Sequence, residues 1–436
     1  MPAVPDRRLR WLILGVGWAL ALTYAYPGMM SPDSTAQLIQ ARGGDLISDW
    51  HPAIMAVMWR YVDRVVAGPL GMLLLQTGMF LFGLDALLRR ALRPAAAAAI
   101  AGAILLWPPV LATMAMIWKD AQMAGFLLAG TALIVSPRRG HRVLGLGLLV
   151  VATAMRYNAA AATLPLIVLL LAEHPGRWRR YAIAGLAWLA VSAAALGING
   201  VLTERHDHAW HNSLALFDIV GTINYTEAYA DAEIERDLAG TPLLVHDGIR
   251  LRCRSMYSTS GHYELTHGPG RIFDLPFDQH LDEVAAGWRA VVAHHPWAYL
   301  AHRLAVFGHL IAVTGPLDTP LWRAPPTKQV AESLHIRSEH SAVQSRVMRV
   351  LYLLAHTWLF FPHTYLVLAL VMLPLCRSRL GAALLLSGLC YELGLLIAAP
   401  SPDARYSHWM IATTLAGIVL TFQSRRSAGP AAPRSE

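Results

Sequence analysis

Charged residues are scarce in this sequence. They make up 15% of the 436 residues, whereas hydrophobic residues make up 55%, and the mean hydropathy is +0.42. One soluble core of this length could not bury so much apolar surface. The composition therefore excludes an ordinary soluble protein and predicts that a lipid bilayer covers the surplus.

Cysteine and the common nucleotide motifs are also missing or rare. The three cysteines are Cys253, Cys376 and Cys390, and the last two flank or lie within apolar segments. This pattern predicts neither a disulfide framework nor a cysteine metal site. No G-x-G-x-x-G follows a strand pattern, and neither G-x-x-x-x-G-K-[ST] nor Asp-x-Asp occurs, which excludes soluble nucleotide chemistry.

What the sequence has instead is a series of long apolar runs. A membrane-spanning helix needs about 20 apolar residues, and this criterion predicts an all-α polytopic membrane protein of about ten transmembrane helices, within a range of ten to twelve. The expected spans are Trp11 to Tyr26, Leu70 to Leu88, Pro94 to Ile117, Ala121 to Val135, Val143 to Met155, Ala159 to Ala172, Tyr181 to Val201, Val350 to Leu375, Leu380 to Ala399 and His408 to Phe422. Two further crossings, at 302–313 and 347–360, would give twelve. Pro108-Pro109 predicts a kink in the third span.

The arginines predict the orientation of these spans. The net charge is +8, but the arginines form short clusters between apolar runs rather than one basic face, so no nucleic-acid partner is expected. The clusters are Arg7-Arg8-Arg10, Arg89-Arg90-Arg93, Arg138-Arg139-Arg142, Arg177-Arg179-Arg180, Arg377-Arg379 and Arg425-Arg426. All fall on one side of the membrane, which the positive-inside rule makes cytoplasmic, and both termini share that side.

This threading divides the chain into four parts. Residues 1–202 form a seven-helix membrane module whose first outer loop, 27–69, is acidic. Residues 203–344 form a large outer region, residues 345–424 the closing membrane helices, and residues 425–436 a cytoplasmic tail.

Ionisable residues gather in the outer turns, where each one adjoins the end of a span. The candidates are Asp33, Asp49, His51, Lys119, Asp120, Arg156, Tyr157, Asn158, Asp403, Arg405 and Tyr406. Several neighbouring spans are short, so Asp120 and Arg156 are expected below the headgroup plane, where ionisable groups face a protein-lined cavity and carry function. An Arg whose head reaches the interface is the simpler alternative.

This mixture of carboxylates and cations suits the departure of a lipid-linked phosphate from a sugar. Lys119, Arg156 and Arg405 would bind the phosphate. Asp33 or Asp49, with His51 nearby, would act as the general base toward an incoming hydroxyl. The alternative interpretation is that the same residues form structural ion pairs between the ends of helices.

A metal site is a second possibility. His206-Asp207-His208 and His211 lie close together at the start of the large outer region. Because no second ligand pair at helical spacing accompanies them, solvated loop histidines explain the pattern better than a zinc site. The dependence on a divalent cation stays open.

The order of these motifs resembles that of the glycosyltransferase C superfamily, which includes protein O-mannosyltransferases and the transferases that add aminoarabinose to lipid A. The matching pieces are one span, an acidic outer loop, six more spans, a large outer region and a few closing spans. Within them lie Ser31-Pro32-Asp33-Ser34, Trp118-Lys119-Asp120, Arg156-Tyr157-Asn158, His295-Pro296 with Tyr299-Leu300, and Asp403 to Tyr406. The resemblance implies that Asp33 is the catalytic carboxylate, with Asp49 as the competitor. Unlike the mannosyltransferases, this chain has Ser34 rather than Glu after that Asp.

The resemblance implies a membrane glycosyltransferase of the bacterial inner membrane. It would move a sugar from a polyprenyl-phosphate donor to a lipid, glycan or protein acceptor at the outer face, with inversion, because one base and no covalent nucleophile are apparent. A transporter or flippase for a lipid-linked or anionic solute is the alternative, with Asp120 and Arg156 lining its path.

Overall fold

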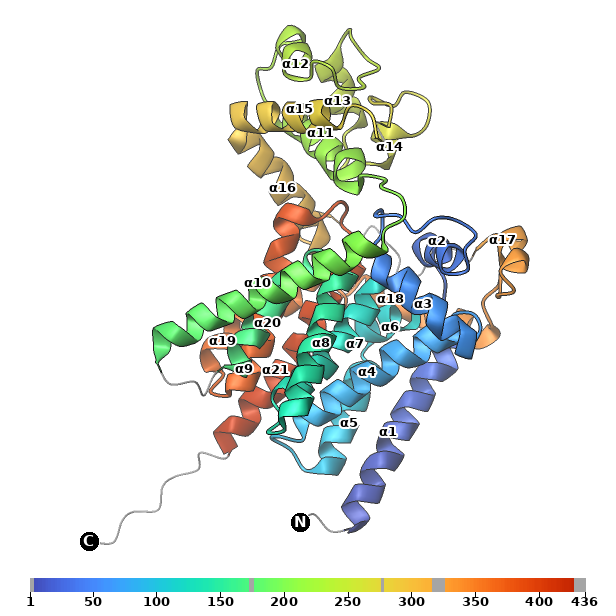
Figure 1. Cartoon of the computed structure of the whole chain (residues 1–436), viewed down its shortest axis with the longest axis vertical. Coiled ribbons are helices and arrows are strands. Elements are labelled where there is room, and N and C mark those ends of the chain that lie inside the picture. Colours follow the sequence, from blue (N-terminus) through green and yellow to red (C-terminus); the bar gives the residue numbers. More distant parts are fainter. Residues whose placement is uncertain (1–3, 172–175, 276–277, 316–325, 427–436) are drawn as a thin grey trace.

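The computed structural model describes residues 4–171, 176–275, 278–315 and 326–426, and this part of the chain is helical, with isolated β-bridges but no strands. A helical bundle carries a smaller group of helices, α11 to α16, at one end (Figure 1). The first turn of α1 and the last turn of α21 both lie toward the opposite end of the bundle (Figure 1).

The helices follow the expected apolar runs closely. The bundle contains α1 (Val4–Ala25), α4 (Leu70–Leu88), α5 (Pro94–Leu105), α6 (Pro108–Ala115), α7 (Lys119–Ile134), α8 (Arg139–Met155), α9 (Ala159–Leu170), α10 (Arg177–Leu202), α18 (Ala342–Ala355), α19 (Pro362–Leu375), α20 (Arg379–Ala398) and α21 (His408–Arg426). The first outer loop forms α2 (Pro32–Ala41) and α3 (Ala53–Val65). The outer region contains η1 (Trp210–Ala215), α11 (Leu216–Tyr225), α12 (Asp231–Asp237), α13 (Ile249–Met256), α14 (Tyr263–Thr266), α15 (Leu281–His294), α16 (Pro296–Leu310) and α17 (Lys328–Ser333), and η2 (Ala404–Ser407) precedes α21.

Three described helices, α4, α10 and α20, are long and apolar enough to cross a membrane alone. Helices α5 and α6 meet that criterion together, with a bend of 70° between them. The bend falls at Pro108-Pro109 and confirms the predicted kink, because proline has no amide hydrogen to continue the preceding helix. The chain is thus an all-helical membrane protein, and the total of ten spans stays a prediction.

The expectation of one continuous span over 350–375 is wrong. Helix α18 ends at Ala355, and α19 begins at Pro362 after a turn. Proline is favoured at the first position of a helix, where no intrahelical hydrogen bond is lost, so Pro362 starts a new helix instead of extending the old one. The apolar run alone did not reveal this boundary.

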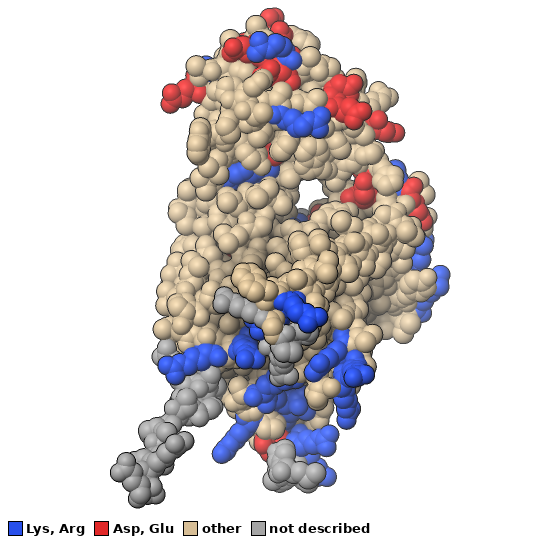
Figure 2. All heavy atoms as spheres, turned by 60° about the vertical axis from the view of Figure 1, so that its left-hand side comes forward, with Lys and Arg blue, Asp and Glu red and all other residues tan. Residues whose placement is uncertain are grey.

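Basic residues gather at one end of the bundle, which we call the basic end (Figure 2). The first turns of α1, α8, α10 and α20 lie there, and each carries arginine or is preceded by it. We call the opposite end, where α7 begins and α20 ends, the outer end. The predicted tail at 425–436 lies largely outside the described residues, since α21 continues to Arg426.

A buried ion network fastens the outer helices to the bundle. Asp218 of α11 accepts a hydrogen bond from Trp288 Nε1 of α15 at 2.9 Å, and it pairs with Arg303 of α16. His302 Nε2 lies 3.3 Å from the same carboxylate. Arg303 also donates to the carbonyl oxygen of Ala399 at 2.9 Å, directly after α20. The outer helices are therefore fixed to the end of α20 by one arginine.

We expect Asp218→Asn to lower the stability of the protein. The substitution leaves the guanidinium of Arg303 buried without its anion, a loss of about 3–5 kcal/mol. Thermal unfolding in detergent measures this loss, and Asp247→Asn, at an exposed acid in the same outer region, is the control. Equal melting temperatures for the two variants would contradict the assigned role.

Candidate functional site

The site begins with two chain segments that run side by side. Met29 donates its amide hydrogen to the carbonyl of Ala115 at 2.9 Å, and Ile117 donates to the carbonyl of Met29 at the same distance. Gly28, at a φ of +119°, precedes this bridge, and a Cβ there would lie 2.9 Å from the side chain of Ile117. Only glycine suits both this conformation and this close approach.

The bridge brings the start of α2 next to the start of α7. Trp118 Nε1 donates to Ser31 Oγ at 2.9 Å. Ser31 is also the N-cap of α2 in a capping box with Ser34. Asp33 therefore lies in a fixed first turn, where the helix dipole favours its negative charge.

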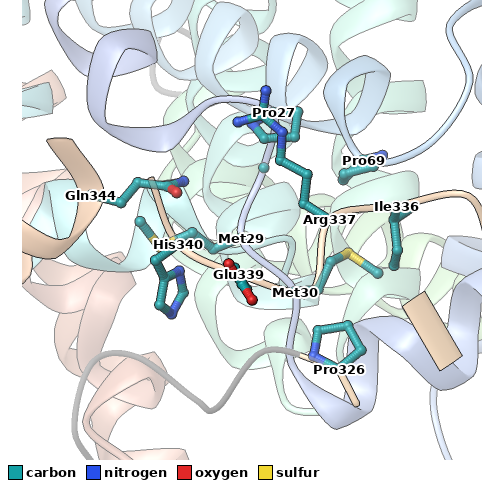
Figure 3. A pocket seen from close by; sticks show the side chains of 11 residues that line it. Pro27, Met29, Met30, Pro69, Pro326, Ile336, Arg337, Glu339, His340 and Gln344 are labelled. Carbon is teal, nitrogen blue, oxygen red and sulfur yellow. The ribbon is translucent and has the colours of Figure 1, made fainter. Parts of the chain in front are cut away.

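A small pocket lies beside residues 27–30, between this segment and the residues that precede α18 (Figure 3). Its volume is about 20 Å³, which is room for about one water molecule. It is lined by Pro27, Gly28, Met29, Met30, Pro69, Pro326, Ile336, Arg337, Glu339, His340 and Gln344. The pocket is too small for a substrate, so the chemistry of the site must lie elsewhere.

Arg405 is the centre of the site. Its guanidinium is 2.8 Å from Asp33 Oδ2 and 3.0 Å from Asp403 Oδ2, and its Nε is 3.9 Å from Asp120 Oδ2. It also lies over the ring of Trp118, 4.7 Å from the centroid. The side chain is only 8% exposed, so the surrounding carboxylates are what allow it to stay charged there.

A second arginine shares one of these carboxylates. Arg156, which follows the end of α8, pairs with Asp120 and donates from Nε to Asn158 Oδ1 at 3.2 Å. The ring of Tyr406 lies 4.3 Å from the Arg156 guanidinium carbon. The neighbouring Tyr157 is half exposed. Arg156 and Arg405 therefore both contact Asp120, from two segments that are far apart in the sequence.

The third cation of the site is Lys119, whose Nζ lies 3.2 Å from His51 Nδ1. Burial and the nearby charge of Lys119 lower the pKa of His51 to about 3, so its ring is neutral near pH 7. A neutral ring can accept a hydrogen bond at Nδ1 from the ammonium group. His51 therefore orients Lys119 rather than adding a positive charge.

Asp33 is the carboxylate that is both ionised and accessible. Burial raises its pKa, but the charges of Arg405 and Lys119 outweigh burial and hold the pKa well below its usual range. Its side chain is 30% exposed, whereas those of Asp120 and Asp403 are 1% and 5% exposed. A ligand that enters the site can therefore reach Asp33 before either of the others.

Asp49, the predicted competitor, lies in different surroundings. Its Oδ1 accepts the amide hydrogens of Asp207 at 2.6 Å and of His208 at 3.1 Å, and its Oδ2 is 3.3 Å from His206 Nδ1. These contacts hold the turn that follows α10. Both oxygens of Asp49 thus contact this turn, whereas Arg405 and Arg156 pair with other carboxylates.

The described residues do not form a metal site. None of their groups of His, Cys, Asp and Glu brings together three side chains suited to a metal ion. The rings of His206, His208 and His211 contact one another at centroid distances of 5.9 and 6.0 Å. Asp33, Asp120 and Asp403 all face Arg405, so the guanidinium compensates part of their negative charge.

Two residues of the site were not predicted as functional, namely Ser31 and Trp118. They hold α2 against α7 and provide the ring on which Arg405 lies. Their positions in the sequence could have identified them, because each lies within two residues of a predicted site residue in an outer turn.

The chain was compared with known proteins. No family model and no curated protein matches it. Among solved structures it is similar to ArnT from Cupriavidus metallidurans, crystallised bound to undecaprenyl phosphate, with 16% identity and a TM-score of 0.36. The match covers 98% of this chain and 79% of that chain. We therefore infer the function from the contacts of this chain's own residues.

Proposed function

We propose that the protein is a membrane glycosyltransferase that moves a sugar from a polyprenyl-phosphate donor to an acceptor hydroxyl at the outer face of the membrane. One observation carries this proposal: an accessible ionised carboxylate, Asp33, lies in contact with a buried cation at the outer end of the bundle. Arg156 and Lys119 add two more cations there. The acceptor is a lipid, glycan or protein, and the membrane is the bacterial inner membrane with both termini cytoplasmic.

The reaction needs a base for the acceptor hydroxyl and a group that binds the departing phosphate. The acceptor oxygen forms the new bond to that carbon as the bond to the phosphate oxygen breaks, so the configuration inverts. The electron pair of the broken bond stays on the phosphate, where Arg405 and Lys119 stabilise it. The proton of the acceptor hydroxyl goes to Asp33.

The ion pair between Asp33 and Arg405 makes the free enzyme a poor base. A carboxylate whose pKa is held far below its usual range takes up a proton weakly. The donor phosphate competes with Asp33 for the guanidinium of Arg405, because arginine binds phosphate and carboxylate with the same geometry. Binding of the donor thus frees Asp33 from Arg405 and raises its basicity. Asp33 therefore becomes an effective base only when the sugar-carrying donor is bound.

The remaining residues hold this arrangement in place. Asp120 keeps the two arginines together, and Asn158 orients Arg156 from the same turn. Asp403 accepts from the amide of Arg405 as well as pairing with its side chain, which fixes the start of η2. These contacts limit the movement that Arg405 can make when the phosphate arrives.

We expect Asp33→Asn to lower turnover at least 100-fold, since a general base contributes about 10²–10⁴ to the rate. Transfer of radiolabel from a polyprenyl-phosphate sugar to an acceptor in a membrane extract measures this effect. Asp49→Asn is the matched control and should keep most of the activity, because Asp49 binds backbone amides.

A larger loss with Asp49→Asn than with Asp33→Asn would reverse the assignment of the base. Absence of transfer with every donor, together with solute uptake in proteoliposomes, would favour a transporter instead.

Lys119→Gln should weaken donor binding about tenfold. The substitution removes a cation that faces the donor phosphate while His51 stays neutral, and a hydrogen bond to a charged group contributes about 1.5–3 kcal/mol. The KM for the donor measures the effect, with Lys328→Gln, at an exposed lysine, as the control. An unchanged KM would remove Lys119 from the phosphate site.

The pH dependence should show no inflection between pH 5 and 7. The pKa of Asp33 is lowered, so its carboxylate loses its charge only as the pH falls well below 4, and His51 gains a charge only near pH 3. A profile of kcat/KM against pH tests this, in wild type and in His51→Gln. An inflection near pH 6.5 that disappears in His51→Gln would show that His51 titrates during the reaction.

A further inference from the structure

A groove of about 490 Å³ lies between α9, α10 and α20, and none of its lining residues belongs to the site described above. Most of its lining is apolar, including Pro165, Leu169, Ala382, Ala383, Leu386 and Cys390. The small side chains of Ala382 and Ala383 leave space on the α20 side. The groove is therefore a hollow in the helical bundle rather than a gap in the outer region.

The mouth of the groove is polar and positively charged. Arg180 and Tyr181 contribute from the first turns of α10, and Arg379 begins α20. Arg180 donates to the hydroxyl of Tyr181 at 3.0 Å, and its guanidinium carbon lies 4.8 Å from the centre of that ring. Both arginines lie near the starts of their helices. The groove thus runs from two cations into an apolar interior.

Its length matches one leaflet of a bilayer. From Arg379 to Cys390, α20 rises about 16 Å at about 1.5 Å per residue. Half of a hydrocarbon core of about 30 Å is close to this value. The side chains of Leu186, Leu189 and Leu386 on the flanking helices are exposed, as expected for a surface that lipid covers.

We propose that this groove binds one anionic glycerophospholipid of the leaflet at the basic end. Its phosphate lies against Arg180 and Arg379, and one of its acyl chains lies between α9 and α20. A zwitterionic lipid has the same acyl chains but no net charge, so the two arginines provide the selectivity. This inference is independent of the proposed reaction, because none of the groove-lining residues takes part in it.

The bound lipid connects the first turns of α10 and α20. Helix α10 crosses the front of the bundle obliquely (Figure 1). Near its other end, Asn199 accepts from the amide of Ile54 at 3.1 Å and donates to the carbonyl of Ala154 at 2.8 Å. Trp188 Nε1, in the middle of α10, donates to the carbonyl of Ala160 in α9 at 2.8 Å. A lipid between the first turns of α10 and α20 adds an attachment at the start of α10. Anionic lipid should therefore raise the thermal stability of the protein.

Native mass spectrometry of the purified full chain tests the proposal with phosphatidylglycerol and phosphatidylcholine as the probes. Wild type should retain one phosphatidylglycerol in preference to phosphatidylcholine and should melt at a higher temperature with the former. Arg180→Gln combined with Arg379→Gln should reduce this preference about tenfold, since each basic residue near an anionic lipid adds to the attraction. Arg138→Gln combined with Arg139→Gln removes two exposed arginines of the same end and should leave the preference unchanged.

A second variant keeps the proposal testable if the arginine variant fails to fold. Leu386→Trp fills the apolar part of the groove and leaves both arginines in place, so it should lose the retained lipid of either class. Equal retention of the two lipids by wild type, or wild-type preference in the Arg180 and Arg379 variant, would overturn the proposal. Retention unchanged in Leu386→Trp would place the lipid outside the groove.

Discussion

The structure of the outer end depends on one buried guanidinium, that of Arg405. Removing an arginine from water costs several kcal/mol unless anions replace the lost hydration. Asp33, Asp120 and Asp403 replace it, and they come from α2, α7 and the segment before α21. Because each anion lies on a different element, the requirement of this one side chain fixes the mutual positions of three elements.

A second buried arginine, Arg303, connects the outer helices to the site. Arg303 binds the carbonyl oxygen of Ala399, four residues before Asp403. Asp218 holds Arg303 from α11, so the segment between α20 and α21 is attached both to the outer helices and to the bundle. A shift of the outer helices would therefore move the segment that carries Arg405. The ion networks of Arg303 and Arg405 together define the geometry in which a ligand meets Asp33.

Much of the fold, but less of the site, could be predicted from the sequence. Span length and proline position are local properties, so the bounds of α4 and the break at Pro108 follow from the apolar runs. Placement in the outer turns likewise identified the residues around Arg405. Which carboxylate faces the cations is a tertiary property, because Asp33 and Asp49 are both acidic residues of one predicted loop. Asp33 pairs with Arg405, whereas Asp49 accepts the amide hydrogens of Asp207 and His208. The break before Pro362 was missed because apolar residues continue on both sides of it.

The charges of the site explain why a carboxylate that begins in an ion pair suits the proposed reaction. Arg405, Arg156 and Lys119 balance Asp33, Asp120 and Asp403 in the free protein. A donor phosphate that carries one negative charge gains a second as its bond to the sugar breaks. Asp33 loses its own charge in the same step by accepting the proton of the acceptor. The sum of charges around Arg405 therefore stays constant along the reaction, and a buried environment in which net charge is expensive need not reorganise.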